Sequence, residues 1–186
     1  HRDLTTKTFV ANVSDYEQMK AFAFFVESEF GKVDLLINNA GIGLGAFFQD
    51  CSLKDMQELF DTNFWGVVYG CKVFLPLLER ADEGHIVNIS SVLGLVSGPR
   101  VSAYCSSKFA VRGFSDSLRH DFRLIGNRIK VSCAFPSGIK TNILASSKIV
   151  IPGGIDSSAD KERQRVEPWF WSQPDEAARH ILSGVS

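Results

Sequence analysis

The chain has 186 residues, of which 45% are hydrophobic and 22% are charged, and its formal net charge is −1. These values are ordinary for one globular domain and leave no basic excess for binding nucleic acid. The longest apolar run, Gly66–Leu78, contains Lys72 and Pro76 and is too short to span a bilayer. Four widely spaced cysteines without a C-x-x-C pair predict reduced thiols in a cytoplasmic protein, and neither a disulfide framework nor a metal site.

The first predicted elements are a short strand and a helix. Thr8–Val13 is a β-prone run. Ser14 and Glu17 have the spacing of a capping box with Ser14 as the N-cap, and an apolar stripe at helical spacing follows it. Gly31 is expected to end this helix, because glycine readily adopts the left-handed conformation of a helix terminus.

A buried strand and a long helix come next. Val33–Ile37 is a continuous apolar run, typical of a parallel strand that is buried on both faces. The run leads directly into Asn38-Asn39-Ala40-Gly41. Ser52 is the predicted N-cap of the following helix, Lys54–Glu79, whose broad apolar face indicates burial against more than one neighbour.

The alternation of strand and helix continues through the second half of the chain. Ile86–Ile89 and Ile129–Phe135 are predicted strands, and Ser102–Ile125 is the predicted helix between them, with Gly126 after its end. Strands and helices that alternate with short links predict an α/β fold, a doubly wound parallel sheet with helices on both faces.

The segment Ile143–Glu167 lacks this regularity. It follows the carboxyl end of a predicted strand, where open α/β sheets bind ligands, so residues 143–172 are predicted to form a substrate lid. Trp169 and Trp171 would line or anchor this lid, and its apolar content favours a hydrophobic substrate. A last helix is expected to begin near Pro174.

Tyr104 and Lys108 are the residues whose spacing suggests chemistry. They lie four positions apart at the start of a helix, which places them on one face, about 5–6 Å apart at Cβ. A free tyrosine has a pKa near ~10, and an ammonium group nearby lowers it, so the phenol would exchange a proton near neutral pH. Ser90 or Ser91, at the end of the preceding strand, would hold a substrate oxygen beside this phenol.

Several motifs in this order resemble those of the classical short-chain dehydrogenase/reductase family, from about Asn12 to the end of the chain. The sequence Asn38-Asn39-Ala40-Gly41 follows a buried strand, as in the family, and Tyr104-x-x-x-Lys108 matches the family's motif. Asn63 lies in the next helix, where the family has its catalytic asparagine.

Two further matches come from the serine pair and the loop after the last predicted strand. Ser91 precedes Tyr104 by thirteen residues, which is the family's spacing for its catalytic serine, and Ser90 is the competing assignment. The segment Pro136–Thr141 looks like the turn that holds the nicotinamide end of the cofactor in the family.

The resemblance implies catalytic roles for Asn63, Ser91, Tyr104 and Lys108. Tyr104 would be the general acid in reduction and the base in oxidation. Lys108 would lower the pKa of Tyr104 and bind the nicotinamide ribose. Ser91 would orient the substrate oxygen, and Asn63 would hold a water molecule that links Lys108 to solvent.

The implied cofactor is NAD or NADP, and the residues that decide between them are not in the chain. Asn12 and Val13 would flank the adenine ring, and Asn39–Gly41 would lie along the adenosine, whereas Asn38 is expected to pin neighbouring strands. The complete set of expected cofactor-binding residues is Asn12, Val13, Asn39, Ala40, Gly41, Tyr104, Lys108, Pro136, Gly138, Ile139 and Thr141.

The chain departs from the family pattern in three ways. The family's glycine-rich turn, which binds the cofactor pyrophosphate, is absent. Asn12 replaces the family's aspartate, and Ser137 replaces a glycine, which is tolerable only if its φ is negative. Of the family's strand order 3-2-1-4-5-6-7, the chain supplies 3, 4, 5 and 6. We therefore expect one Rossmann-like catalytic domain over residues 1–186 that is incomplete at both ends, without the first βαβ unit and the last strand, and so a piece of a longer polypeptide.

The leading hypothesis is an NAD(P)-dependent oxidoreductase that acts on a small carbonyl or alcohol substrate. The alternative is a catalytically silent fragment that acts as a binding or dimerisation module. A Ser–Lys hydrolase built on Ser91 and Lys108 is disfavoured, because the chain has no Gly-x-Ser-x-Gly elbow. The resemblance also implies a homodimer or homotetramer through the helices Lys54–Glu79 and Ser102–Ile125, although core burial explains their apolar faces as well.

Overall fold

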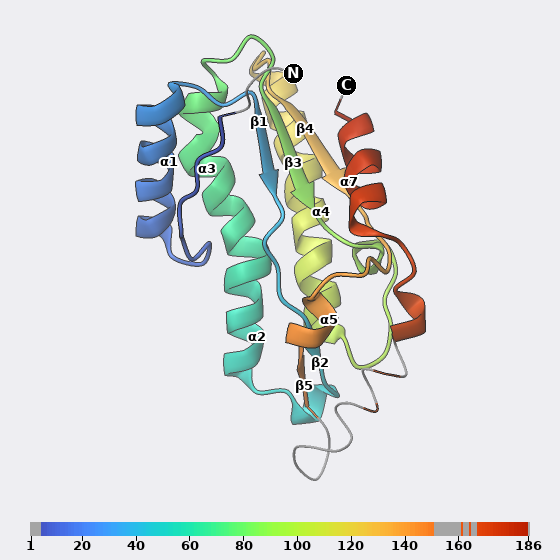
Figure 1. The fold of residues 1–186 in the computed structure, drawn as a ribbon. Coiled ribbons are helices and arrows are strands. Elements are labelled where there is room, and N and C mark those ends of the chain that lie inside the picture. The colour runs from blue at the N-terminus through green and yellow to red at the C-terminus, as the bar shows by residue number, and fades with distance from the viewer. Residues whose placement is uncertain (1–4, 151–160, 162–163, 165–166, 186) are drawn as a thin grey trace.

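A three-stranded parallel sheet lies at the centre of the computed structural model, which describes residues 5–150, 161, 164 and 167–185. Its strands are β1 (Leu35–Asn38), β3 (His85–Ile89) and β4 (Lys130–Ala134), in the order β1-β3-β4. The three arrows point the same way in Figure 1. The predicted α/β fold with a parallel sheet is therefore confirmed.

The register of the sheet brings the carboxyl ends of the strands to one edge. Asn38 pairs with Asn88, and Ile89 pairs with Ala134. All five residues of β3 are buried, because this strand has a neighbour on each side and helices over its faces. On β1, in contrast, Ile37 is 41% exposed, and among the described residues β1 pairs with β3 alone.

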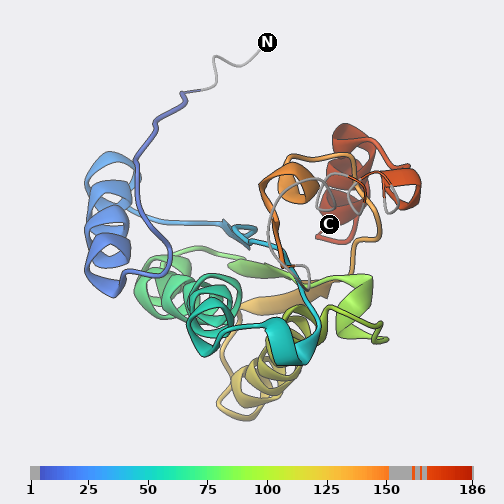
Figure 2. The same ribbon diagram turned by 90° about the horizontal axis from the view of Figure 1, so that it is seen from below.

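Helices cover both faces of the sheet. Figure 2 shows α3 (Gly66–Leu78) and α4 (Ser102–Leu124) below the strands and α7 (Pro174–Ser183) above them. Helix α1 (Tyr16–Phe30) packs against α3. The main core between these layers includes Met19, Val67, Phe74, Leu78, Ile86, Val111 and Val131.

The predicted helix Lys54–Glu79 is continuous but contains a wide turn. It consists of α2 (Leu53–Phe60), the π-helical segment η2 (Asp61–Trp65) and α3. Ser52 caps α2 by accepting a hydrogen bond from the backbone N–H of Asp55, as predicted. A π-turn is rare and commonly lies at a functional site, and this one contains Asn63.

Two predictions for the amino-terminal region are wrong. Thr8–Val13 forms no strand in the structure, because an extended segment becomes a strand only when a neighbour takes up its backbone hydrogen bonds. Instead, Phe9 stacks on Phe22 of α1, with ring centroids 5.4 Å apart. The N-cap of α1 is Asp15, because the hydroxyl of Ser14 donates to Asn12 Oδ1 at 2.9 Å.

The segment predicted to be irregular contains short elements where the structure describes it. Helix α5 (Ile143–Ser146) leads into β5 (Lys148–Ile149), which pairs in parallel with β2 (Leu44–Gly45). This pairing joins residues far apart in the sequence, so local patterning did not indicate it. Much of the predicted lid at 143–172, including 151–160, lies outside the described residues.

Three short 3-10 turns complete the described elements: η1 (Phe48–Asp50), η3 (Val92–Gly94) and η4 (Glu167–Trp169). A second, smaller core contains Leu44, Leu59 and Ala103, with Tyr104 packed against it. This cluster holds β2 and α2 against the start of α4. Within the part of the chain that the structure describes, no helix is both long and apolar enough to cross a membrane.

Candidate active site

Four predicted residues gather at the carboxyl edge of the sheet. Ser91 follows β3, Tyr104 and Lys108 lie in the first turns of α4, and Asn63 lies in the π-turn η2. Three different parts of the fold position these four residues, and all four are largely removed from solvent. The buried carboxyl edge of a parallel sheet is where this architecture commonly binds ligands.

Tyr104 is hydrogen-bonded to Ser91 and has a raised pKa. Burial of the phenol raises the pKa of Tyr104, the hydrogen bond with Ser91 lowers it, and the neighbouring Cys105 raises it further. The sequence predicted a pKa lowered by Lys108, whereas burial gives the phenol a raised pKa in the structure. Lys108 Nζ lies over the ring of Tyr104, 5.7 Å from its centroid, and donates to the carbonyl of Ile89 at 3.0 Å.

Lys108 is a buried cation, with 4% of its surface exposed. Burial lowers the pKa of Lys108 to about 8, and the nearby Cys133 opposes this shift. With this pKa, the ammonium form still outnumbers the neutral amine by roughly ten to one at pH 7. The side chain is therefore mostly charged at neutral pH and able to release a proton under mildly alkaline conditions.

Asn63 is fully buried and uses its whole amide group. Its Oδ1 accepts from the backbone N–H of Ile42 at 2.8 Å, and its Nδ2 donates to the Ile42 carbonyl at 3.0 Å and to Ser107 Oγ at 3.3 Å. Gly41 lies beside this group, because a Cβ on Gly41 would sit 3.3 Å from Asn63 Oδ1 and 3.6 Å from Lys108 Nζ. The structure thus brings Gly41, Asn63 and Lys108 together.

The two serines of the pair after β3 point to different partners. Ser90 Oγ donates to the backbone carbonyl of Lys108 at 2.8 Å, so its hydroxyl hydrogen is used in binding α4. Ser91 Oγ accepts from the backbone N–H of Leu93 at 3.1 Å and is hydrogen-bonded to Tyr104. The geometry therefore favours Ser91 over Ser90 as the partner of the phenol.

In the Asn-Asn-Ala-Gly segment, Asn38 has a structural role, whereas the next two residues are exposed. Asn38 Nδ2 donates to Asn88 Oδ1 at 2.8 Å, so Asn38 joins β1 to β3 as expected. Asn39 and Ala40 are exposed, and they line a pocket of about 190 Å³ together with Val13. Asn12 does not line this pocket, and its Oδ1 accepts from Ser14.

The loop after β4 lies next to the serine pair. The carbonyl of Pro136 accepts from the backbone N–H of Val92 at 2.9 Å. Ser137 has a negative φ, as its replacement of a glycine requires. Among the described residues, Arg100 is the one non-glycine residue with a positive φ. Ile139 forms an isolated parallel bridge with Ser172, while Thr141 is exposed.

Ser107 is a buried residue of this region that the sequence analysis missed. Its hydroxyl donates to the carbonyl of Tyr104 at 2.8 Å and accepts from Asn63. The available signal was its position directly before Lys108. No group of three or more metal-ligating side chains occurs among the described residues.

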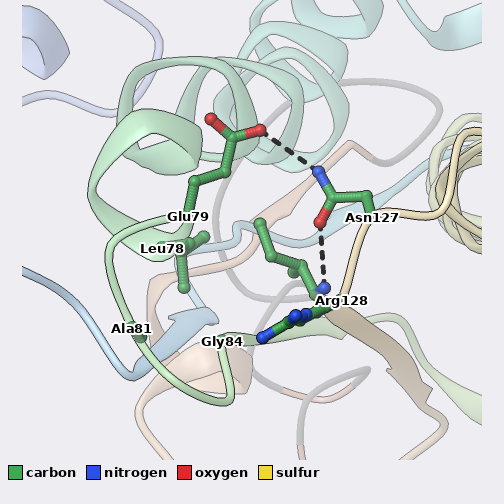
Figure 3. Close-up of a pocket in the computed structure, with 7 residues that line it drawn as sticks. Leu78, Glu79, Ala81, Gly84, Asn127 and Arg128 are labelled. Carbon is green, nitrogen blue, oxygen red and sulfur yellow. Dashed lines mark hydrogen bonds between the residues drawn. The ribbon is translucent and has the colours of Figure 1, made fainter.

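A second pocket lies at the opposite edge of the sheet, before the amino ends of β3 and β4. It has a volume of about 280 Å³, and Figure 3 shows Glu79, Gly84, Asn127 and Arg128 around it. Glu79 accepts from Asn127 Nδ2 at 3.1 Å, and Asn127 Oδ1 accepts from the backbone N–H of Ile129. These bonds join α3 to β4 and are remote from Tyr104.

Comparison with known proteins places the chain among dehydrogenases. The family model described as short chain dehydrogenase matches residues 2–162. A Mycobacterium tuberculosis protein named as an oxidoreductase, SadH, is 38% identical over 181 residues, which cover 94% of this chain and 62% of that protein. "Uncharacterized oxidoreductase SSP1627" of Staphylococcus saprophyticus is 31% identical over 178 residues, covering 94% of this chain and 68% of that protein.

Solved structures give the same result. A short chain dehydrogenase/reductase from Burkholderia phymatum in complex with NAD is 32% identical and has a TM-score of 0.77, with 86% of this chain and 59% of that chain covered. The aldohexose dehydrogenase of Thermoplasma acidophilum, in ligand-free form, is 25% identical and has a TM-score of 0.79. The match covers 97% of this chain and 71% of that chain. The chain thus spans about three fifths to two thirds of the length of several relatives. It belongs to the short-chain dehydrogenase family.

Proposed function

We propose that the chain carries the catalytic residues of an NAD(P)-dependent oxidoreductase that interconverts a carbonyl compound and an alcohol. The observation that carries this proposal is the convergence of the Tyr104 phenol, the Ser91 hydroxyl and the Lys108 ammonium at the carboxyl edge of the sheet. An acid, a hydroxyl and a cation gathered at one edge of the sheet are the groups that proton transfer to a carbonyl oxygen requires. The cofactor would supply the hydride.

The residues present fit such a cofactor. Gly41 lets the loop after β1 pack close to Asn63 and Lys108, because a Cβ on Gly41 would lie 3.3 Å from Asn63 Oδ1 and 3.6 Å from Lys108 Nζ. We assign Asn39–Gly41 and Val13 to the adenosine side and Lys108 to the ribose. The loop residues Pro136, Gly138, Ile139 and Thr141 would hold the nicotinamide end. The Burkholderia phymatum relative, whose structure contains NAD, supports this cofactor class.

Tyr104 is best suited to act as a proton donor. Because burial raises the pKa of Tyr104, its phenol is protonated at neutral pH and able to donate to a carbonyl oxygen that Ser91 holds. The reverse reaction needs the phenolate, so alcohol oxidation should increase with pH through the alkaline range. Lys108, with its pKa of about 8, would pass protons onward, and Asn63 would hold a water molecule that connects it to solvent.

The remaining assignments concern the surroundings of the site. We propose that residues 143–172 act as a lid, since Lys148 is anchored to Asp55 by an ion pair of 2.5 Å beside the site's smaller core. The apolar content of this segment supports a hydrophobic substrate. We also propose a cytoplasmic homodimer or homotetramer that associates through α2, α3 and α4. The comparisons give no support to a catalytically silent module.

The test begins with the intact mass of the protein from its natural source, set against the 20.6 kDa of this chain. The isolated protein is then titrated with NADH and NADPH and assayed with aliphatic and aromatic ketones. We expect saturable binding, turnover, and a loss of turnover of at least about a thousandfold in Tyr104→Phe with cofactor affinity unchanged. Turnover in Tyr104→Phe that equals the wild type would refute the assignment.

A further inference from the structure

Ser107 joins the helix that carries Tyr104 and Lys108 to the asparagine of the π-turn. It lies on α4 and is fully buried. Its hydroxyl donates to the carbonyl of Tyr104 at 2.8 Å and accepts from Asn63 Nδ2 at 3.3 Å. Both hydrogen-bonding functions of the hydroxyl are therefore used, one on each side of the contact between α4 and η2.

The far side of Asn63 extends this connection to the loop after β1. Asn63 binds both the N–H and the carbonyl of Ile42, which follows Gly41. A Cβ on Gly41 would lie 3.6 Å from Lys108 Nζ, so the loop closes over the lysine. A hydrogen-bonded path thus runs from Ile42 through Asn63 and Ser107 to the backbone of Tyr104.

We propose that Ser107 is a positioning residue that fixes the Gly41–Ile42 loop against α4 and thereby keeps Lys108 enclosed. Its catalytic consequence rests on the function proposed above, whereas its effect on Lys108 does not. Without the hydroxyl, one hydrogen of the Asn63 amide has no partner in a buried position, which favours a shift of the amide and of the loop bound to it. Water would then reach Lys108.

The same helix provides a matched control. Ser115 is also fully buried, donates to a backbone carbonyl in its own helix (Val111, 2.7 Å) and accepts from an asparagine amide (Asn88 Nδ2, 2.9 Å). Asn88 in turn binds Asn38 in the middle of the sheet. Ser115→Ala therefore removes the same kinds of bond as Ser107→Ala, together with a hydrogen bond to Cys133, but leaves the loop over Lys108 intact.

The experiment follows the titration of Lys108 by NMR in protein labelled with ¹³C at the lysine ε-carbon, with Lys108→Met identifying the signal. Tyr104 and Cys133 are the titratable groups that face Lys108, and neither is replaced. Ser115→Ala removes a hydrogen bond that lowers the pKa of Cys133, so any effect on Lys108 is opposite in sign to the rise expected in Ser107→Ala. We expect Ser107→Ala to raise the measured pKa of Lys108 by about one pH unit or more as water enters. Ser115→Ala should leave it where it is in the wild type, and Ser107→Thr, which keeps the hydroxyl, should restore it.

Turnover gives the second measurement. We expect Ser107→Ala to lower kcat about tenfold and to move the pH profile of kcat in parallel with Lys108, with Ser115→Ala within about twofold of the wild type. An unchanged Lys108 titration in Ser107→Ala, or an equal change in Ser115→Ala, overturns the proposal.

If the wild type shows no oxidoreductase turnover, the proposed function fails, and the lysine titration still decides the role of Ser107. If Ser107→Ala does not fold, the comparison of Ser107→Thr with Ser107→Cys, a weaker hydrogen-bonding group of similar size, makes the same decision.

Discussion

Two buried polar networks meet α4, and they differ in what surrounds them. The network at the carboxyl edge joins Asn63 and Ser107, lies beside the cation Lys108, and ends on the exposed loop residue Ile42. The network in the middle of the sheet contains Asn38, Asn88 and Ser115, is neutral, and lies between β1, β3 and α4. The same amide–hydroxyl pairing thus occurs once next to an exposed loop and once between the strands and α4.

This difference indicates separate roles. Groups enclosed in the core have no water to replace a lost partner, so their hydrogen bonds contribute mainly to the stability of the fold. Groups that end on an exposed loop hold that loop in place, so their arrangement matters more for the geometry of the site. The predictions below test this division, beginning with the largest expected effect.

Asn88→Ala should be the most destabilising change. It removes the partner of Asn38 and of Ser115 at once and leaves a cavity in a fully buried position. We expect a loss of about 3 kcal/mol in the free energy of unfolding, measured by urea denaturation. Asn63→Ala should cost clearly less, because water reaches the loop at Ile42. An equal loss from the two substitutions would contradict the division between core and rim.

A pair of glycine substitutions sharpens the same comparison. A Cβ at Gly70 would lie 2.2 Å from Asn38 Oδ1 in the core network, so Gly70→Ala should lower the free energy of unfolding by about 2 kcal/mol. At Gly41 the Cβ would lie 3.3 Å from Asn63 Oδ1, beside Lys108. Gly41→Ala should therefore change stability by less than about 1 kcal/mol but weaken NADH binding, measured by fluorescence titration. A larger loss of stability from Gly41→Ala than from Gly70→Ala would show that the network of Asn63 and Ser107 is the one that stabilises the fold.

The smallest predicted effect is a pH dependence of stability that comes from Lys108. Its pKa is about 8 in the folded protein, against an ordinary lysine value of 10.5. Between these two values Lys108 binds more protons in the unfolded chain than in the folded protein, so its contribution to stability rises with pH. Below pH 8 the cost of burying the charged ammonium is fully present. Between about pH 8 and pH 9 the unfolding free energy of the wild type, minus that of Lys108→Met, should increase by about 1 kcal/mol.

The comparison with Lys108→Met is needed because buried thiols titrate in the same range. Burial raises the pKa of Cys71 to about 12, so the unfolded chain loses that proton first and stability falls as pH rises above the usual thiol range. Subtracting the variant cancels this contribution. A difference that stays flat across this pH interval, with both proteins folded, would show that Lys108 is not buried as the structure has it.

The sequence predicted the elements well where the signals are local. The cap at Ser52, the glycine at position 31 with φ of 74° and the helix that begins at Pro174 are all confirmed. The prediction of Ser14 as a cap failed because Asn12 competes for its hydroxyl. The strand predicted at Thr8–Val13 failed because a strand depends on a partner that residues nearby in the chain do not provide.

The sequence by itself determined the alternation of strands and helices, the family, and the types of chemical group that lie at the carboxyl edge. Only the tertiary structure decided that Ser90 faces a backbone carbonyl while Ser91 faces Tyr104, and that Ser107 contacts Asn63. It also decided that Lys108 is buried over the phenol ring and that burial raises the pKa of the phenol. The physical reason is range. Periodicity and capping depend on residues a few positions apart, whereas burial and the choice of hydrogen-bond partner depend on groups 13 to 50 positions away.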